Sequence, residues 1–231
     1  MHNTQSMIEL YHVYKQYIKG DWALQDINLS VRKGEFVFLT GASGAGKTTL
    51  LKLIFKDEVP SKGQILVDST NINLIPPKHV FRLRRKIGII FQDFKLIDSM
   101  TVYENVALPL VVRGERRSVI SRMVHSALSL VGLTHRKNYP PSHISGGEQQ
   151  RVAIARAIVG NPKIIVADEP TGNLDTELSI EVFKIFERIN ANGITIILAT
   201  HDQHLLQLFP RRVLRLDKGR LVSGWDREAR P

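Results

Sequence analysis

The clearest candidate for chemistry is a glycine-rich octapeptide that ends in lysine and threonine. Residues 41–48 read Gly-Ala-Ser-Gly-Ala-Gly-Lys-Thr and match the phosphate-loop pattern G-x-x-x-x-G-K-S/T. Glycines let backbone N–H groups turn inward around phosphates. Lys47 would bring positive charge to the β- and γ-phosphates, and the Thr48 hydroxyl suits Mg²⁺, which prefers oxygen ligands. We expect nucleotide contacts from Gly41, Ala42, Ser43, Gly44, Ala45, Gly46, Lys47, Thr48 and Thr49.

An acidic pair follows a second apolar run. Asp168 ends the run 164–167, and Glu169 comes directly after it. Ligands in α/β sheets bind beyond the carboxyl ends of the strands, so Asp168 is a candidate to hold Mg²⁺, directly or through water. Glu169 is a candidate general base for an attacking water. A purely structural hydrogen-bonded pair is the alternative, and the phosphate loop elsewhere in the same chain weakens it.

Gln92 and His201 each stand just past the end of a predicted core strand. That position is where groups near a γ-phosphate should lie. Gln92 would then sense Mg²⁺ and the lytic water, and His201 would contact the γ-phosphate and orient Glu169. Either residue alone is more often an ordinary polar side chain, but their shared placement favours catalytic roles.

The segment Ser145-Gly146-Gly147-Glu148 permits two interpretations. Serine followed three residues later by glutamate is a capping box, which would make the segment a helix N-terminus and nothing more. The two glycines lower helix stability, however, and make sense if backbone N–H groups approach a phosphate closely.

Elements in the right order surround these residues. Short apolar runs bounded by turn residues predict strands, and alternation of strands with helices predicts a mostly parallel sheet covered on both faces. The predicted strands are 7–11, 27–31, 35–40, 64–67, 86–91, 164–167 and 194–200, with a hairpin over 212–221 that turns near Lys218 and Gly219. Predicted helices begin near Lys47, cover 118–131 and 148–159 within a largely helical stretch from 93 to 160, and include Val182, Phe183, Phe186 and Ile189.

Composition restricts the remaining possibilities. The chain has 231 residues, no cysteine and a net charge of +10, so disulfides and thiolate metal sites are excluded and one large domain is expected. Neither a secretory signal nor a membrane-spanning run is evident, so we expect no transmembrane segment and a membrane role only through a partner. The basic clusters fit solvated surface better than nucleic-acid binding, and no nucleic acid is expected.

In this order, the phosphate loop, Gln92, Ser145-Gly146-Gly147, Asp168-Glu169, the 172–175 turn and His201 resemble the ATP-binding subunit of ATP-binding cassette (ABC) transporters. The resemblance implies a homodimer that forms head to tail on ATP binding, with each ATP between one subunit's Lys47 and the other's Ser145-Gly146-Gly147-Glu148 segment. It also implies that Asp175 crosses the interface and that Tyr17 stacks on adenine, with Tyr14 as the less favoured candidate. The resemblance further implies an ATPase with ATP and Mg²⁺ as ligands, the metal being held by Thr48, Gln92 and Asp168.

The same resemblance implies a P-loop NTPase, an α/β fold with a RecA-like parallel-sheet core, an N-terminal antiparallel β subdomain and an inserted α-helical subdomain. The β subdomain and core would occupy 1–92 and 161–231, and the helical signature subdomain about 93–160, all within a single ABC ATPase domain over 1–231.

Within this family, segments 81–93, 101–107 and 167–175 resemble the FtsE-like cell-division branch. That resemblance implies an integral membrane partner of FtsX type and a peripheral location on the cytoplasmic face of the membrane. ATP-driven movement would then control cell-wall hydrolysis, and the partner would dock near Phe94, Leu96 and Tyr103. An ATPase for lipoprotein release or macrolide export is the alternative, and a nucleic-acid-associated ABC ATPase is less favoured. Ile144 and Glu148 depart from the wider family pattern of leucine and glutamine.

Overall fold

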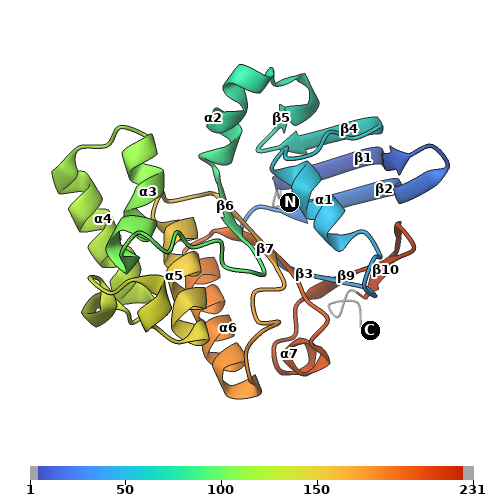
Figure 1. Ribbon diagram of the computed structural model, residues 1–231. Coiled ribbons are helices and arrows are strands. Elements are labelled where there is room, and N and C mark those ends of the chain that lie inside the picture. The colour runs from blue at the N-terminus through green and yellow to red at the C-terminus, as the bar shows by residue number, and fades with distance from the viewer. Residues whose placement is uncertain (1–4, 226–231) are drawn as a thin grey trace.

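Two β-sheets of different character lie on either side of helix α1 in the computed structural model, which describes residues 5–225 (Figure 1). The first sheet is antiparallel and has the order β2-β1-β4-β5. Bulges interrupt the pairing of β1 with β2, and His12 takes a left-handed φ of 46° at one of them. The strands are β1 (Ser6–Ile18), β2 (Asp21–Arg32), β4 (Lys62–Val67) and β5 (Thr70–Asn71).

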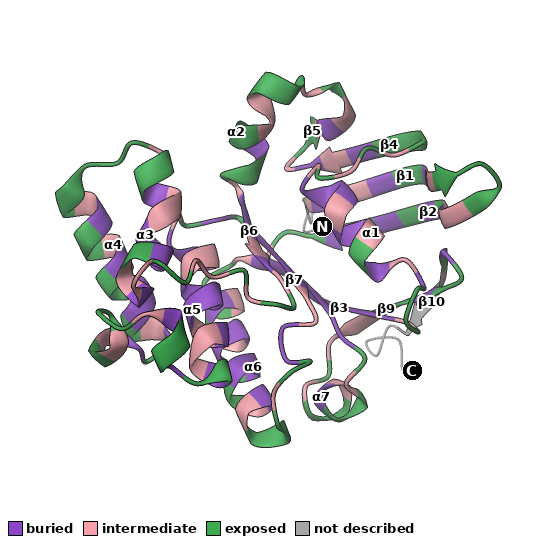
Figure 2. Ribbon diagram, in the orientation of Figure 1, coloured by how far each residue is buried: buried purple, intermediate pink, exposed green. Residues whose placement is uncertain are grey.

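The second sheet forms the centre of the molecule and has the order β10-β9-β3-β8-β7-β6. All its pairings are parallel except that of β10 with β9, which closes a hairpin. Figure 2 shows that β3 and β7 are almost wholly buried, as apolar strands covered on both faces should be. The strands are β3 (Phe36–Thr40), β6 (Ile87–Ile90), β7 (Ile164–Asp168), β8 (Thr195–Ala199), β9 (Arg212–Asp217) and β10 (Arg220–Trp225).

Helices cover both faces of this sheet. On one face, α1 (Lys47–Ile54) buries Leu50, Leu51 and Ile54 between the two sheets. On the other, Phe183 of α6 (Thr176–Ala191) stacks on Phe36 and Phe38 of β3, with ring centroids 5.2 and 5.5 Å apart. Shorter helical turns connect the strands: η1 (Ile72–Leu74), η2 (Pro77–His79), α2 (Val80–Arg84) and α7 (Gln203–Leu208).

A separate group of helices lies to the left in Figure 1, between β6 and β7 in the chain. Thr101 caps α3 and Ser145 caps α5, each through a reciprocal capping box. The α5 helix passes so close to β6 that a Cβ on Gly88 would lie 2.5 Å from the carbonyl oxygen of Ala157. The elements are α3 (Val102–Val112), α4 (Arg117–Leu130), η3 (Thr134–Arg136), η4 (Pro141–His143) and α5 (Gly146–Ile158).

The predicted α/β class, with a parallel core and a separate antiparallel sheet, is confirmed. The boundaries differ in places: β1 and β2 are longer than expected, and residues 93–101 form an irregular segment with short turns rather than helix. Residues 1–4 and 226–231, the ends of the predicted single domain, lie outside the described part. Among residues 5–225, no helix has the length and apolar character needed to cross a bilayer.

Candidate functional site

The loop between β3 and α1 is shaped by glycines in left-handed or otherwise open conformations. Gly41, Gly44 and Gly46 have φ values of 150°, 76° and 105°. A Cβ on Gly46 would meet Ala23 O at 2.7 Å, so only glycine fits where the loop passes β2. The α1 helix then begins at Lys47 without a side-chain cap, which leaves its first N–H groups available to an anion. Ala42, Ser43 and Gly44 are exposed, whereas Ala45 is buried.

Lys47 is buried and its ammonium group points back into the loop. Nζ donates to Gly41 O at 2.9 Å and to Ala42 O at 3.3 Å, and it lies 3.4 Å from Glu169 Oε1. The ammonium group therefore stands at the centre of the loop, where a nucleotide's terminal phosphates would meet it.

Glu169 follows β7 and has its own left-handed φ of 46°. Its N–H donates to Ala199 O of β8, which fixes the residue against the neighbouring strand. His201 follows β8, and its Nδ1 lies 2.8 Å from Glu169 Oε2. Parallel pairing of β7 with β8 thus brings the two residues together, as the sequence predicted for adjacent strand ends. The histidine side chain is 68% exposed, so it can reach a bound substrate.

Asp168 at the end of β7 has an unusual environment for a carboxylate. Burial is the largest influence and raises its pKa, and the nearby charge of Glu169 adds to this, whereas a hydrogen bond from Thr48 and the charge of Lys47 oppose it. A desolvated carboxylate beside a threonine hydroxyl is a donor set that Mg²⁺ prefers. Within residues 5–225 no group of three His, Asp or Glu side chains could hold a metal, so a Mg²⁺ ion at Asp168 would take its other ligands from neutral side chains such as Thr48, from phosphate oxygens and from water.

Gln92 lies two residues beyond the end of β6 and is exposed. The side-chain amide nitrogen of Asn173 lies 3.5 Å from the backbone carbonyl oxygen of Gln92. Asn173 belongs to the turn that follows Glu169. The strand end that carries Gln92 is therefore linked to the 172–175 turn. Sequence reasoning did not single out Asn173, because an asparagine in a turn is ordinary.

Ser145 and Glu148 form the predicted capping box. Ser145 N–H donates to Glu148 Oε2 at 2.8 Å, and Glu148 N–H donates to Ser145 Oγ at 3.2 Å. Arg136 lies 3.0 Å from the other carboxylate oxygen. The backbone bond to Ser145 and the contact with Arg136 hold the pKa of Glu148 below its usual value, against the effect of burial. Both carboxylate oxygens of Glu148 thus bind groups of its own subunit.

The two glycines of this segment differ in their surroundings. A Cβ on Gly146 would meet no atom within 4 Å, whereas one on Gly147 would lie 3.2 Å from Leu178 of α6. Glycine at position 147 is therefore explained by packing against Leu178. Packing does not explain the glycine at position 146, because a side chain would fit there.

Two further predicted residues lie at the edges of the site. Tyr17 on β1 is 53% exposed, and its hydroxyl lies 3.4 Å from Thr49 Oγ1 on α1, so its ring stands beside the phosphate loop. Asp175 caps α6 by accepting from Leu178 N–H at 2.9 Å, and its side chain is exposed.

The structure thus gathers part of the predicted set at one edge of the central sheet: Lys47, Thr48, Asp168, Glu169 and His201. Ser145, Gly146 and Asp175 belong to helix N-termini in other parts of the subunit. Arg156, which contacts the segment after Gln92, was missed, because an arginine on an amphipathic helix gives no signal of its partner.

Comparison with known proteins agrees with this geometry. The family model described as ABC transporter matches residues 24–172. The cell division ATP-binding protein FtsE of Bacillus subtilis is 48% identical over 96% of this chain and 97% of its own length. FtsE of Mycobacterium tuberculosis is 49% identical over 96% of each chain. A dimeric structure of the ATP-binding cassette MJ0796, in a post-hydrolysis state with ADP and Pi, has a TM-score of 0.87 at 35% identity and covers 95% of this chain and 98% of its own.

Proposed function

This chain belongs to the ABC transporter family as an ATP-hydrolysing subunit, and we propose that it serves a membrane complex that acts in bacterial cell division. Support for the cellular role comes from the FtsE proteins, which are named for cell division and are nearly half identical over almost the whole chain. The observation that carries the chemistry is the position of Glu169, with one carboxylate oxygen facing Lys47 and the other His201.

These contacts suggest how the residues act on ATP. Glu169 takes a proton from water as the water oxygen attacks the γ-phosphorus and the bond to the β–γ bridging oxygen breaks. Lys47 stabilises the charge on the phosphate oxygens, and His201 orients Glu169. Thr48, Asp168 and Gln92 would hold Mg²⁺, which when bound supplies further neutralisation of phosphate charge.

We further propose that the active form is a head-to-tail homodimer. Among residues 5–225, the first N–H groups of α5 have no hydrogen-bond acceptor beyond the cap, and Gly146 leaves the approach to them open. A phosphate of ATP held on the partner subunit would suit this helix end. The exposed Asp175 would lie at the same interface. The MJ0796 cassette was captured as a dimer with ADP and Pi, which supports this arrangement.

The membrane partner would be of FtsX type, and the chain would lie peripherally on the cytoplasmic face of the membrane. Phe94, Leu96 and Tyr103 remain our proposed docking residues. All three are partly buried, and Leu96 and Tyr103 pack against the core cluster of the helical group. A partner bound there would contact the segment that begins at Phe94, two residues after Gln92.

A complementation experiment tests the cellular role. Expression of this chain in bacteria depleted of their own FtsE should restore division, and co-expression of the cognate FtsX-type protein would be included because the two must fit. The Lys47→Ala variant should fail at equal protein level, since it lacks the phosphate-binding ammonium group; Lys33→Ala, an exposed lysine on a turn, is the control. Rescue of lipoprotein release instead of division would replace this function with the export alternative.

A further inference from the structure

The segment between Gln92 and α3 contains two successive residues in a left-handed conformation. Phe94 and Lys95 have φ values of 56° and 51°, and neither is glycine. Each such residue costs roughly 1 kcal/mol relative to an ordinary conformation, so the surrounding structure must hold both in place.

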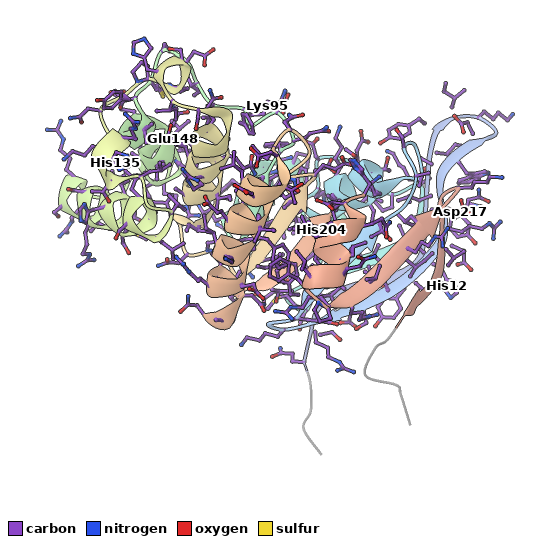
Figure 3. All side chains as sticks on the ribbon, turned by 90° about the horizontal axis from the view of Figure 1, so that it is seen from below. His12, Lys95, His135, Glu148, His204 and Asp217 are labelled. Carbon is purple, nitrogen blue, oxygen red and sulfur yellow. The ribbon has the colours of Figure 1, made fainter. Side chains whose placement is uncertain are left out.

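Arg156 of α5 holds both residues in this conformation through hydrogen bonds to their carbonyls. One guanidinium nitrogen, Nη2, donates to Phe94 O and the other, Nη1, donates to Lys95 O, each at 2.5 Å. The planar fork of arginine suits two neighbouring acceptors, which the point charge of lysine cannot match. Burial lowers the pKa of Arg156, and its guanidinium group donates hydrogen bonds to both carbonyls. Figure 3 shows Lys95 on the same side of the molecule as Glu148 at the start of α5.

The rest of the segment is also held by the helical group. Asn105 of α3 is fully buried, and its amide accepts from Ile97 N–H and donates to Ile97 O and Met100 O. Residues 94–100 are thus attached to α3 and α5. Gln92 lies between this attached segment and β6 of the central sheet.

The opposite end of β6 is held by similar chemistry. Arg113, which directly follows α3, donates to Arg85 O at 3.0 Å and to Gly160 O at 2.8 Å. Burial lowers the pKa of Arg113 as well, ahead of the repulsion from Arg85. Two partly desolvated arginines of the helical group therefore donate hydrogen bonds to main-chain carbonyls on either side of β6. Arg113 binds before this strand and Arg156 binds after it.

We propose that Arg156 is a positioning residue that couples the orientation of α5 to Gln92. The Cα of Arg156 lies ten residues, or about 15 Å of helix rise, from that of Gly146, where the trans phosphate would bind. Through Arg156, a change in the tilt of α5 would move the carbonyls of Phe94 and Lys95. The side chain of Gln92, two residues before Phe94, would move with them. This inference rests on the proposed function, because it assigns Gln92 to the hydrolytic site.

The experiment compares Arg156→Met with Arg113→Met in the full chain. Both variants remove a partly desolvated arginine that donates to two carbonyls, so they match in size and chemistry, and only Arg156 acts beside Gln92. The first readout is hydrogen exchange of the amides of residues 93–97 without nucleotide. The second is steady-state ATP hydrolysis, with kcat and KM determined separately. Arg156→Lys is the third variant, which retains the charge but loses the fork.

In Arg156→Met the amides of 93–97 should exchange at least about tenfold faster, because the left-handed turn loses its hold. We expect kcat to fall about tenfold to a hundredfold, as for a misplaced catalytic group, with KM for ATP within about twofold of wild type. Arg156→Lys should fall between Arg156→Met and wild type in both readouts. Arg113→Met should leave exchange at 93–97 unchanged and kcat within about twofold of wild type.

Equal exchange at 93–97 and equal kcat in the two methionine variants would overturn the coupling role, leaving Arg156 as a structural contact only. The coupling role would also be overturned if Arg156→Lys matched wild type in both amide exchange and kcat. If the wild-type chain itself hydrolysed no ATP, the proposed function would fail, while the exchange data would still report on whether Arg156 holds the turn.

Discussion

Glu169 and Lys47 face each other across the phosphate loop, with the carboxylate oxygen Oε1 3.4 Å from Nζ. Both side chains are largely buried, at 16% and 8% exposure, so neither charge is well solvated. A phosphate group entering the loop would attract the ammonium group and compete with the carboxylate for it. Nucleotide binding would therefore weaken the attachment of Glu169 and leave it able to take a proton from water.

Replacement of Glu169 by glutamine tests the general base. The amide cannot take a proton, so ATP hydrolysis should slow by about a hundredfold to ten-thousandfold while ATP binding persists. Persistent ATP should in turn hold two subunits together. Size-exclusion chromatography with ATP should then show a dimer for Glu169→Gln, and a purely monomeric profile would argue against the sandwich arrangement.

Gly146→Ala tests the trans phosphate site without disturbing the fold. A Cβ there would have no atom of the described residues within 4 Å, and alanine favours helix over glycine by about 1 kcal/mol, so the free energy of unfolding should stay the same or rise. ATP-dependent dimerisation and hydrolysis should nevertheless be lost, because the Cβ would obstruct the approach of phosphate.

Gly147→Ala is the matched comparison for this glycine. Its Cβ would press on Leu178 at 3.2 Å, so some loss of stability is expected along with any functional defect. Full ATP-dependent dimerisation of Gly146→Ala would contradict the assignment of this helix end.

Asp168→Asn should stabilise the nucleotide-free protein at neutral pH. The folded-state pKa of Asp168 is raised chiefly by burial, so its stabilising contribution exists below the unfolded pKa and is lost as pH rises through the folded pKa. Removal of the ionised carboxylate should raise the free energy of unfolding on the order of 1 kcal/mol at neutral pH, as is common for strained functional sites.

The gain from Asp168→Asn should shrink as the pH is lowered toward the unfolded pKa of aspartate, where the wild-type side chain is also neutral. Urea denaturation at several pH values measures this. Thermal unfolding with ATP and Mg²⁺ adds a second check: wild type should be stabilised by Mg²⁺, and Asp168→Asn much less. Equal Mg²⁺ dependence in both proteins would exclude Asp168 as a metal ligand.

Glu148→Ala should destabilise the protein by about 1–2 kcal/mol at neutral pH, because it leaves Ser145 as the cap but removes the acceptor of Ser145 N–H and the partner of Arg136. The pKa of Glu148 is lowered, first by the bond from Ser145 N–H, so its contribution is present above the unfolded pKa and is lost as pH falls through the folded pKa. Glu148→Gln keeps an acceptor for Ser145 and should lose less. Denaturation curves at neutral and acid pH test this: wild type and Glu148→Gln should approach equal stability in acid, where the wild-type carboxyl is neutral, and Glu148→Ala should remain less stable than both.

The sequence predicted the parts of the site whose positions follow from topology. Asp168 and His201 were placed correctly because the carboxyl ends of parallel strands share one edge. The Ser145 capping box was also predicted, since its two hydrogen bonds depend on spacing along one helix.

Other features depended on contacts that spacing cannot reveal. The left-handed turn at Phe94 and Lys95 lies at the start of the predicted helical stretch, where the structure has no helix, yet neither residue is a typical helix breaker. Its partner, Arg156, lies 61 and 62 residues away in the chain. The packing of Gly147 on Leu178 likewise arises only when α5 and α6 meet. Such long-range contacts leave no periodic pattern in either segment.

The phosphate loop owes its shape to both ends of the chain. Gly219 N–H, in the β9–β10 turn, donates to Ala45 O at 3.1 Å, and Gly219 O accepts from Gln25 N–H of β2 at 2.7 Å. A Cβ on Gly41 would lie 2.4 Å from Leu216 O, so β9 also confines the loop. During synthesis, residues 41–48 therefore reach their final packing only after Gly219 has left the ribosome.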